Sequence, residues 1–236
     1  MSGTPEILAL HGNLGRVEDW TRLGLAGLRA VDLWDFVGLD FHAFAGELAG
    51  PLAEGMEKPV LAGYSLGGRL ALHAMALFPE RWGGAVIASA HPGLCCVEDR
   101  LARRTSDAIW AERARTLPWE EFLADWNRQA LFGAGSADRL QRQSTLAPRR
   151  EEVAVAFETW SLAAQEDLRG ALRAFSAPVL WIVGEHDTRF AAIGESMAEV
   201  FEDFRLLVIP QGGHRVLEEA PEEVAHAVQD LFRSPG

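Results

Sequence analysis

The sequence predicts an α/β fold: a mostly parallel central sheet, helices on both faces of it, and one helical insertion. Two observations predict it. Short apolar runs alternate with longer periodic segments, and this alternation is lost over one long central stretch. Alternation of this kind implies right-handed crossovers between parallel strands, which cover the sheet on both faces. At 236 residues, the chain has a length that an α/β fold often reaches as one unit, so we expect a single domain over 1–236.

Six short apolar runs have the composition of buried parallel strands. They are rich in Leu, Val and Ile without strict alternation of apolar and polar residues, as expected for strands covered on both faces. Between them, three segments have the longer periodicity of helices. We predict strands at 6–10, 29–33, 59–63, 84–89, 178–184 and 204–210. We predict helices at 42–54, 66–78 and 221–233.

The stretch 97–168 has helical periodicity and no strand pattern. Pro118 and Pro148 interrupt it at positions suited to helix starts, because the first turn of a helix leaves its N–H groups unpaired in any case. Predicted strands precede and follow this stretch. We therefore expect a helical cap inserted between two strands of the sheet.

Composition excludes several kinds of partner. The net charge of −12 argues against nucleic acid or an anionic membrane. No run of about 18 apolar residues predicts a membrane span, and the first residues lack the pattern of a signal peptide. The only two cysteines, Cys95 and Cys96, are adjacent and form no disulfide framework, so we expect a cytoplasmic protein. The oligomeric state is not determined by the sequence.

The stretch "VLAGYSLGGRLALH" places a serine between a predicted strand and a predicted helix. The pattern G-x-S-x-G in that context is typical of a nucleophilic serine on a strained turn, where small neighbours are needed. Gly63 and Gly67 meet that need around Ser65. We therefore predict that Ser65 is catalytic and that its hydroxyl projects at the start of the following helix.

A catalytic serine needs a base, and the base needs an acid to orient it. In one common chain order the acid follows the serine and the histidine comes last. Asp187 and His214 each follow a predicted strand, at the sheet edge where ligands gather, and they are the predicted acid and base. Glu185 remains an alternative acid. His186 is expected to face away.

Two backbone N–H groups are expected to stabilise negative charge that develops during the reaction. After the first strand, "HGN" places the N–H of Asn13 beside that of Leu66, which follows the serine. His11 is expected to be structural. No spacing such as H-E-x-x-H indicates a metal, and we expect no cofactor.

Several longer stretches match one known family. They are "HGNLGRVEDW", "GYSLGGR", "HPGL", "ADWNRQALF", "SLAAQEDLRGAL" and "GEHDTRF". Over nearly its full length the chain resembles the α/β-hydrolase superfamily. Within it, the chain resembles the menaquinone-pathway 2-succinyl-6-hydroxy-2,4-cyclohexadiene-1-carboxylate (SHCHC) synthases. "GYSLGGR" followed by "HPGL" is the selective part, because generic esterases of this fold need neither the arginine nor "HPGL".

The resemblance implies a site. It assigns the triad to Ser65, Asp187 and His214, as the residue pattern does. It implies substrate-binding arginines at Arg69, at Arg103 (with Arg104 as a competitor) and, with no clean match, at Arg142. Tyr64, Trp126 and, more weakly, Phe132 match aromatic positions of the family's site. Each has an alternative: Tyr64 and Trp126 could serve only packing, and Arg69 could be a solvated helix residue.

The resemblance also implies a reaction. It would be a lyase that eliminates pyruvate from 2-succinyl-5-enolpyruvyl-6-hydroxy-3-cyclohexene-1-carboxylate, a small anionic substrate. The triad would act as a base relay in it. A second hypothesis is a serine hydrolase of esters, thioesters or carbon–carbon bonds, through an acyl-enzyme on Ser65. A third, a receptor on this fold, is disfavoured by the intact triad. One stretch departs from the family: "DLWDFVGLDF" stands where it carries "DLPGHG", so the loop 34–41, expected beside the site, is rewritten.

Overall fold

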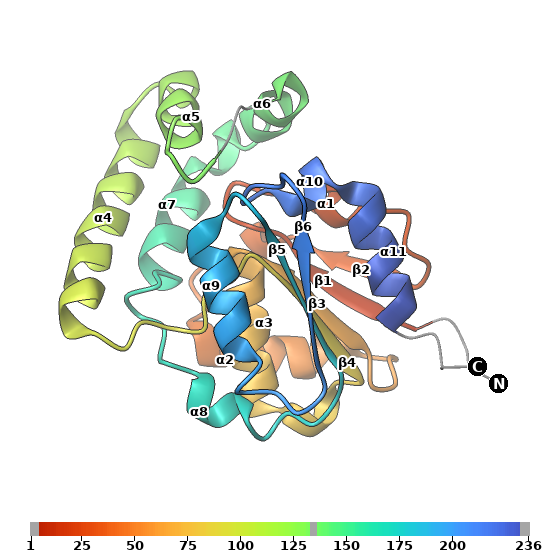
Figure 1. Ribbon diagram of the computed structural model, residues 1–236. Helices are drawn as coiled ribbons and strands as arrows, with labels where there is room; N and C mark the ends of the chain where they lie inside the picture. The colour runs from red at the N-terminus through yellow and green to blue at the C-terminus, as the bar shows by residue number, and fades with distance from the viewer. Residues whose placement is uncertain (1–4, 133–135, 232–236) are drawn as a thin grey trace.

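The computed structural model describes residues 5–132 and 136–231 (Figure 1). Its centre is a six-stranded sheet in the order β2-β1-β3-β4-β5-β6, and every strand pairing among these residues is parallel. The α/β prediction is confirmed, and the sheet is wholly parallel where it was expected to be mostly so. The strands are β1 Ile7–Leu10, β2 Leu28–Val31, β3 Val60–Tyr64, β4 Gly84–Ala88, β5 Val179–Gly184 and β6 Phe204–Ile209.

Helices cover both faces of the sheet, and each face has its own apolar core (Figure 1). Successive strand residues point to opposite faces. In β1, for example, Leu8 and Leu10 join one core, and Ile7 and Ala9 join the other. The first core lies under α2 Phe41–Ala49, α3 Leu66–Leu77 and α9 Thr188–Met197. The second lies under α1 Glu18–Thr21, α10 Val216–Glu219 and α11 Pro221–Leu231.

The three predicted helices are present, with one boundary different. The helix expected at 42–54 ends at Ala49, and a short 3₁₀ turn, Pro51–Ala53, follows it. Pro51 has no N–H for a helical hydrogen bond and its ring clashes with the preceding turn, so the α-helix stops before it. Residues 232–233, the expected end of the last helix, lie outside the described residues.

The sequence did not predict α9, which follows β5. Its centre carries Gly194, where an added Cβ would lie 2.9 Å from the Leu206 side chain and 3.1 Å from Trp181. The helix therefore packs closely onto the sheet through a residue without a side chain. A glycine adds no apolar side chain to the pattern by which a helix is predicted from the sequence. The short helices α1, α10 and α8 Arg169–Leu172, four residues each, were missed too.

The segment between β4 and β5 contains helices in its described part and no strand. Figure 1 shows α4–α7 as a separate group beside the layers of sheet and helices. Pro118 precedes α5, and Pro148 lies in the 3₁₀ turn that leads into α7. The helices are α4 Val97–Thr116, α5 Trp119–Asn127, α6 Ala137–Ser144 and α7 Arg150–Thr159. None of the helices found in the described residues is long and apolar enough to cross a membrane.

Candidate active site

Ser65 is the single residue between the end of β3 and the start of α3. Its backbone has φ 51° and ψ −108°, a region that residues with side chains rarely adopt. The neighbouring glycines allow this turn to form. A Cβ at Gly63 would lie 2.5 Å from the carbonyl oxygen of Gly67, and one at Gly67 would lie 2.3 Å from that of Leu10. Close backbone contact therefore holds Ser65 in its strained conformation.

Ser65, His214 and Asp187 form a continuous hydrogen-bonded chain. Ser65 Oγ lies 3.1 Å from His214 Nε2, and His214 Nδ1 lies 2.6 Å from Asp187 Oδ2. His214 and Asp187 are 2% and 7% exposed, so solvent does not compete for the contact between them. β5 leads into Asp187 at the start of α9, and the turn after β6 carries His214. The three side chains, far apart in sequence, thus meet at one end of the sheet.

The two alternatives beside Asp187 are placed elsewhere. Glu185 and His186 are exposed. Glu185 Oε2 accepts a hydrogen bond from the backbone N–H of Gln211 at 2.8 Å, which ties together the two loops that follow β5 and β6. The structure therefore brings Asp187, and not Glu185, to the imidazole.

His11 has a structural place. It is fully buried; its Nδ1 lies 2.8 Å from the carbonyl oxygen of Gly12, and its Nε2 accepts from the backbone N–H of Leu33 at 3.0 Å. A ring that accepts at Nε2 carries its proton on Nδ1 when neutral, so both nitrogens are used by the backbone. His11 thus joins the loops after β1 and β2.

The two expected oxyanion donors flank Ser65. Asn13 follows β1, and Leu66 is the first residue of α3. Among the described residues, the backbone N–H groups of Asn13 and Leu66 donate no hydrogen bond to another loop, helix or strand. Both residues line the same hollow as Ser65. The N-terminal end of a helix also carries partial positive charge. These two N–H groups are therefore free to bind an oxygen that becomes negative.

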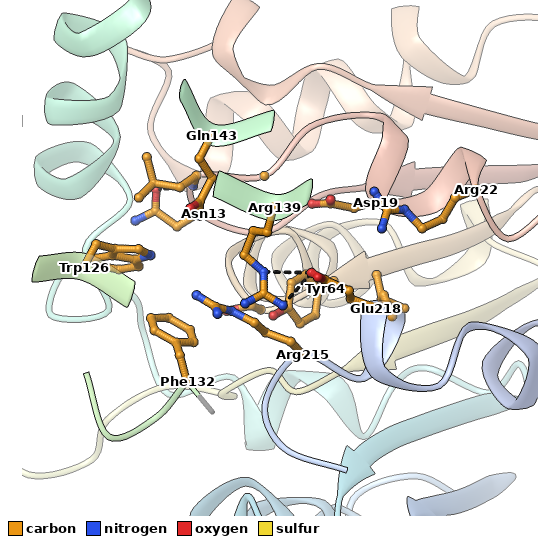
Figure 2. A pocket seen from close by; sticks show the side chains of 14 residues that line it. Asn13, Asp19, Arg22, Tyr64, Trp126, Phe132, Arg139, Gln143, Arg215 and Glu218 are labelled. Carbon is orange, nitrogen blue, oxygen red and sulfur yellow. Dashed lines mark hydrogen bonds and ion pairs between the residues drawn. The ribbon is translucent and has the colours of Figure 1, made fainter. Parts of the chain in front are cut away.

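Two hollows meet at Ser65. We call them the α3 hollow, which contains Arg69 and His214, and the α6 hollow, which contains Tyr64 and residues of α6. Figure 2 shows the α6 hollow. Both hollows are lined by Asn13, Ser65, Trp126 and Phe132. A ligand larger than either hollow can therefore occupy both, with its centre at the serine.

Arg69 lies in the α3 hollow, one turn after Ser65, and is 9% exposed. Its Nη1 donates to the carbonyl oxygen of Trp160 at 2.8 Å, and its guanidinium lies 5.8 Å from the centre of the Phe41 ring. Burial, with repulsion from Arg103, lowers the pKa of Arg69 from 12.5 to about 9. Both direct contacts are uncharged. Among the described residues no carboxylate forms an ion pair with this buried cation, although the charge of Asp107 acts on it from farther away.

Arg103 and Arg104, the two candidates on α4, face different ways. Arg103 lines the α3 hollow, and its Nε donates to Asp107 Oδ2 at 2.8 Å. Arg104 is exposed on the outer surface of α4 beside Ile109. The structure thus brings Arg103 to the hollow and leaves Arg104 outside it.

The predicted aromatic residues all reach the hollows. Tyr64 lines the α6 hollow, and its ring centre lies 5.8 Å from that of His214. Burial and the nearby charge of Asp19 raise the pKa of Tyr64 well above its usual value, so its phenol stays protonated. Trp126 lines both hollows and also packs against Phe157 in the helical segment, so it serves the hollow and the core together.

Arg142 does not line either hollow. It forms an ion pair with Asp138 and lies 3.5 Å from Glu218 Oε2. Three arginines that were not predicted from the sequence line the α6 hollow instead: Arg22, Arg139, one turn earlier on α6, and Arg215. The position of Arg215 directly after His214 was a signal in the sequence that could have found it.

The rewritten loop lies behind the site and not beside it. No residue of 34–41 lines either hollow. The loop acts through contacts: the carbonyl oxygen of Leu39 accepts from Trp160 Nε1 at 2.8 Å, and Phe41 packs against Arg69. Asp35 forms a 2.7 Å ion pair with Arg149, in the segment between β4 and β5. The rewritten loop thus contacts Arg69 through Phe41, and through Leu39 it contacts Trp160, the hydrogen-bond partner of Arg69.

Comparison with known proteins agrees with this fold. Residues 7–227 match the model of a family described as the alpha/beta hydrolase family. The chain belongs to that family. It is 32% identical to the 2-succinyl-6-hydroxy-2,4-cyclohexadiene-1-carboxylate synthase of Klebsiella pneumoniae, over 98% of this chain and 95% of the relative. The resemblance to the SHCHC synthases is therefore confirmed.

Solved structures with the same fold include MenH from S. aureus, with a TM-score of 0.87 at 20% identity over 98% of this chain and 94% of that one. They also include a thermophilic esterase from Thermogutta terrifontis, solved with malate bound, with a TM-score of 0.76 and 26% identity. That match covers 97% of this chain and 89% of the esterase. Both solved structures thus share the fold of this chain.

Proposed function

We propose that this protein eliminates pyruvate from 2-succinyl-5-enolpyruvyl-6-hydroxy-3-cyclohexene-1-carboxylate, in menaquinone biosynthesis. One observation carries the proposal: Arg69, a buried cation with no carboxylate in ion-pair contact among the described residues, lies in the same hollow as Ser65 and His214 of the triad. A neutral ester has no use for such a cation. A substrate with several carboxylates does. The curated relatives named as synthases of the product support this choice.

In the proposed reaction, the triad moves a proton. Ser65 Oγ, polarised by His214, takes the proton from the carbon next to the succinyl carbonyl, and the imidazole receives the proton of the hydroxyl. Asp187 stabilises the imidazolium and fixes the orientation of the ring, as its 2.6 Å contact with Nδ1 allows. The electron pair of the enolate then forms a new carbon–carbon double bond in the ring as the carbon–oxygen bond to the enolpyruvyl group breaks. The imidazolium of His214 gives up its proton, and the leaving group takes up a proton and becomes pyruvate.

The charge that develops on the carbonyl oxygen needs stabilisation. The backbone N–H groups of Asn13 and Leu66 are placed to supply it, since neither is used within the described structure outside its own element. Donors fixed in advance are worth more than water, because they need no reorientation during the reaction. Arg69 and Arg103 would bind carboxylates of the substrate, and Trp126 would pack against its ring.

We also propose that the segment 97–168 acts as a cap over the site and that the enzyme works in the cytoplasm. The cap proposal is supported by Arg103, Trp126 and Arg139, three residues of this segment that line the two hollows. The location is supported by the bacterial relatives named as SHCHC synthases.

A serine hydrolase remains the second candidate, because the contact of Ser65 with His214 is also what an acyl-enzyme mechanism needs. The esterase at 26% identity supports it. The two candidates are separated by one experiment. Pyruvate release from the enolpyruvyl substrate is measured beside hydrolysis of a panel of neutral esters. Rapid pyruvate release that Ser65→Ala abolishes supports the lyase, and ester cleavage without pyruvate release would replace it with the hydrolase.

A further inference from the structure

Arg139 and Arg215 line the α6 hollow and are 7% and 6% exposed (Figure 2). In each, one guanidinium nitrogen, Nη1, is buried and has no hydrogen-bond partner. A buried charged group with an unused donor is unfavourable unless something else compensates it. Two buried arginines, each with one unused donor, therefore line the same hollow.

The contacts of Arg215 leave its charge uncompensated. Its Nη2 donates to the side-chain oxygen of Asn127, and its guanidinium lies 4.0 Å from the centre of the Phe132 ring. Both partners are neutral. Glu218, the nearby carboxylate, is already used: its Oε2 lies 2.6 Å from Arg139 Nη2, and its Oε1 accepts from Ser136 Oγ at 2.6 Å.

The other ionisable groups of the hollow do not neutralise it. Asp19 and Arg22 carry opposite charges and both line it. Even with Asp19 and Glu218 both ionised, the three arginines that line the hollow, Arg22, Arg139 and Arg215, leave one excess positive charge. Tyr64 stays neutral, because burial keeps its phenol protonated. The α6 hollow is therefore positive, although the protein as a whole has a net charge of −12.

We infer that Arg215, together with Arg139, forms a second anion subsite that binds a carboxylate of the substrate, separate from the subsite of Arg69 and Arg103. This rests on the proposed function, because it assigns one more carboxylate of the same substrate. The two hollows share Ser65, so a substrate held at both ends has its reacting carbon at the serine. Guanidinium groups suit this task, because their planar donors match a carboxylate.

The test replaces Arg215 with glutamine, which keeps a hydrogen-bonding side chain and removes the charge. Pyruvate release is followed with the enolpyruvyl substrate. Arg215→Gln is expected to lower kcat/KM at least 10-fold, with Arg215→Lys in between, because lysine keeps the charge without the planar fork. Arg128→Gln is the matched control: Arg128 follows α5, its side chain is 73% exposed, and it lines neither hollow.

Binding is measured separately, in the inactive Ser65→Ala background, by calorimetric titration with the same substrate. Adding Arg215→Gln is expected to weaken binding at least 10-fold, and adding Arg128→Gln to leave it within 2-fold. Equal binding with and without Arg215 would overturn the subsite. If Arg215→Gln does not fold, Arg215→Lys and Arg139→Gln are measured by the same titration. Unchanged binding in both variants would overturn the proposed subsite.

Failure of the proposed function has a different signature. The wild type would then release no pyruvate. In that case the subsite is judged by titration with succinate, a simple dicarboxylate. Binding that Arg215→Gln weakens 10-fold supports an anion subsite for another substrate, and absent or unchanged binding overturns it.

Discussion

Replacing Arg69 with methionine is expected to make the protein more stable and less active. Burial lowers the pKa of Arg69 from 12.5 to about 9, so folding disfavours its charged form. At 1.36 kcal/mol per pKa unit, that is a cost of about 5 kcal/mol, present below pH 9 and smaller as the pH rises above it. Methionine removes this cost and keeps most of the side-chain volume.

The same variant loses two favourable interactions of the guanidinium. Their loss offsets only part of the stability gained by removing the buried charge. The carbonyl oxygen of Trp160 would have no donor, which costs about 1–3 kcal/mol, and the interaction with the Phe41 ring contributes about 1 kcal/mol. The free energy of unfolding is therefore expected to rise by about 1–3 kcal/mol. Activity is expected to fall in the same variant. A charge-assisted hydrogen bond to a substrate carboxylate contributes about 1.5–3 kcal/mol, so kcat/KM is expected to fall about 10- to 150-fold.

The assay pairs urea unfolding at pH 7 with pyruvate release from the enolpyruvyl substrate. Arg150→Met is the matched control. Arg150 also donates to backbone carbonyl oxygens, those of Arg115 and Leu117, and lies 5.7 Å from the ring centre of Trp119, but it lines neither hollow. The Arg150→Met variant should have a lower free energy of unfolding than the wild type and an unchanged kcat/KM. If Arg69→Met loses stability and keeps kcat/KM, Arg69 is a structural residue and the argument for an anionic substrate is wrong.

Three further changes test the rest of the site. Ser65→Ala should lower kcat roughly 10³-fold or more, and adding His214→Ala should cost little further, because a triad acts as one unit; losses that multiply would speak against the unit. Asp187→Asn should lower kcat roughly 10²-fold or more, whereas Glu185→Gln should leave it within about 2-fold; the reverse order would make Glu185 the acid. Burial lowers the pKa of His73 to about 3, so His73 is neutral in the fold and takes up a proton on unfolding below pH 6.5. The wild type should therefore lose about 2 kcal/mol of stability through His73 between pH 8 and pH 5. Between pH 8 and pH 5, the free energy of unfolding of His73→Phe, measured in urea, should therefore fall by about 2 kcal/mol less than that of the wild type. The same pH dependence in both proteins would refute the role given to His73.

Much of the fold could be predicted because its signal is local. A strand buried on both faces needs a continuous apolar run, and each of the six runs is a strand in the structure. The turn at Ser65 has a local signal as well, its two glycines, although the contact that requires Gly67 comes from Leu10 on the neighbouring strand β1. The helix α9 was not predicted, although Phe190, Ile193 and Met197 pack against the core at helical spacing. Gly194 occupies one position of that pattern and contributes no apolar side chain, because the helix lies too close to the sheet there.

The serine, the acid and the base were predicted from chain order and strand ends, with Asp187 as the acid, but spacing alone left Glu185 open as an alternative. Both residues follow β5, two positions apart, and the turn buries one while exposing the other. Similarly, Arg103 and Arg104 are neighbours on α4. A helix turns about 100° per residue, so only one of them can face the hollow.

The sequence by itself determined the parallel sheet, the strained serine turn, the order of the triad and the family, because apolar runs, a short glycine motif and the order of residues along the chain are visible without any tertiary contact. Only the tertiary structure decided which charges face the substrate. Arg142 is paired away from the hollows, and Arg139 and Arg215 line the α6 hollow, because the fold brings α6 against the turn after His214. A side chain's partners come from residues distant in the chain, and the free energy of a buried charge depends on those partners rather than on its neighbours in sequence.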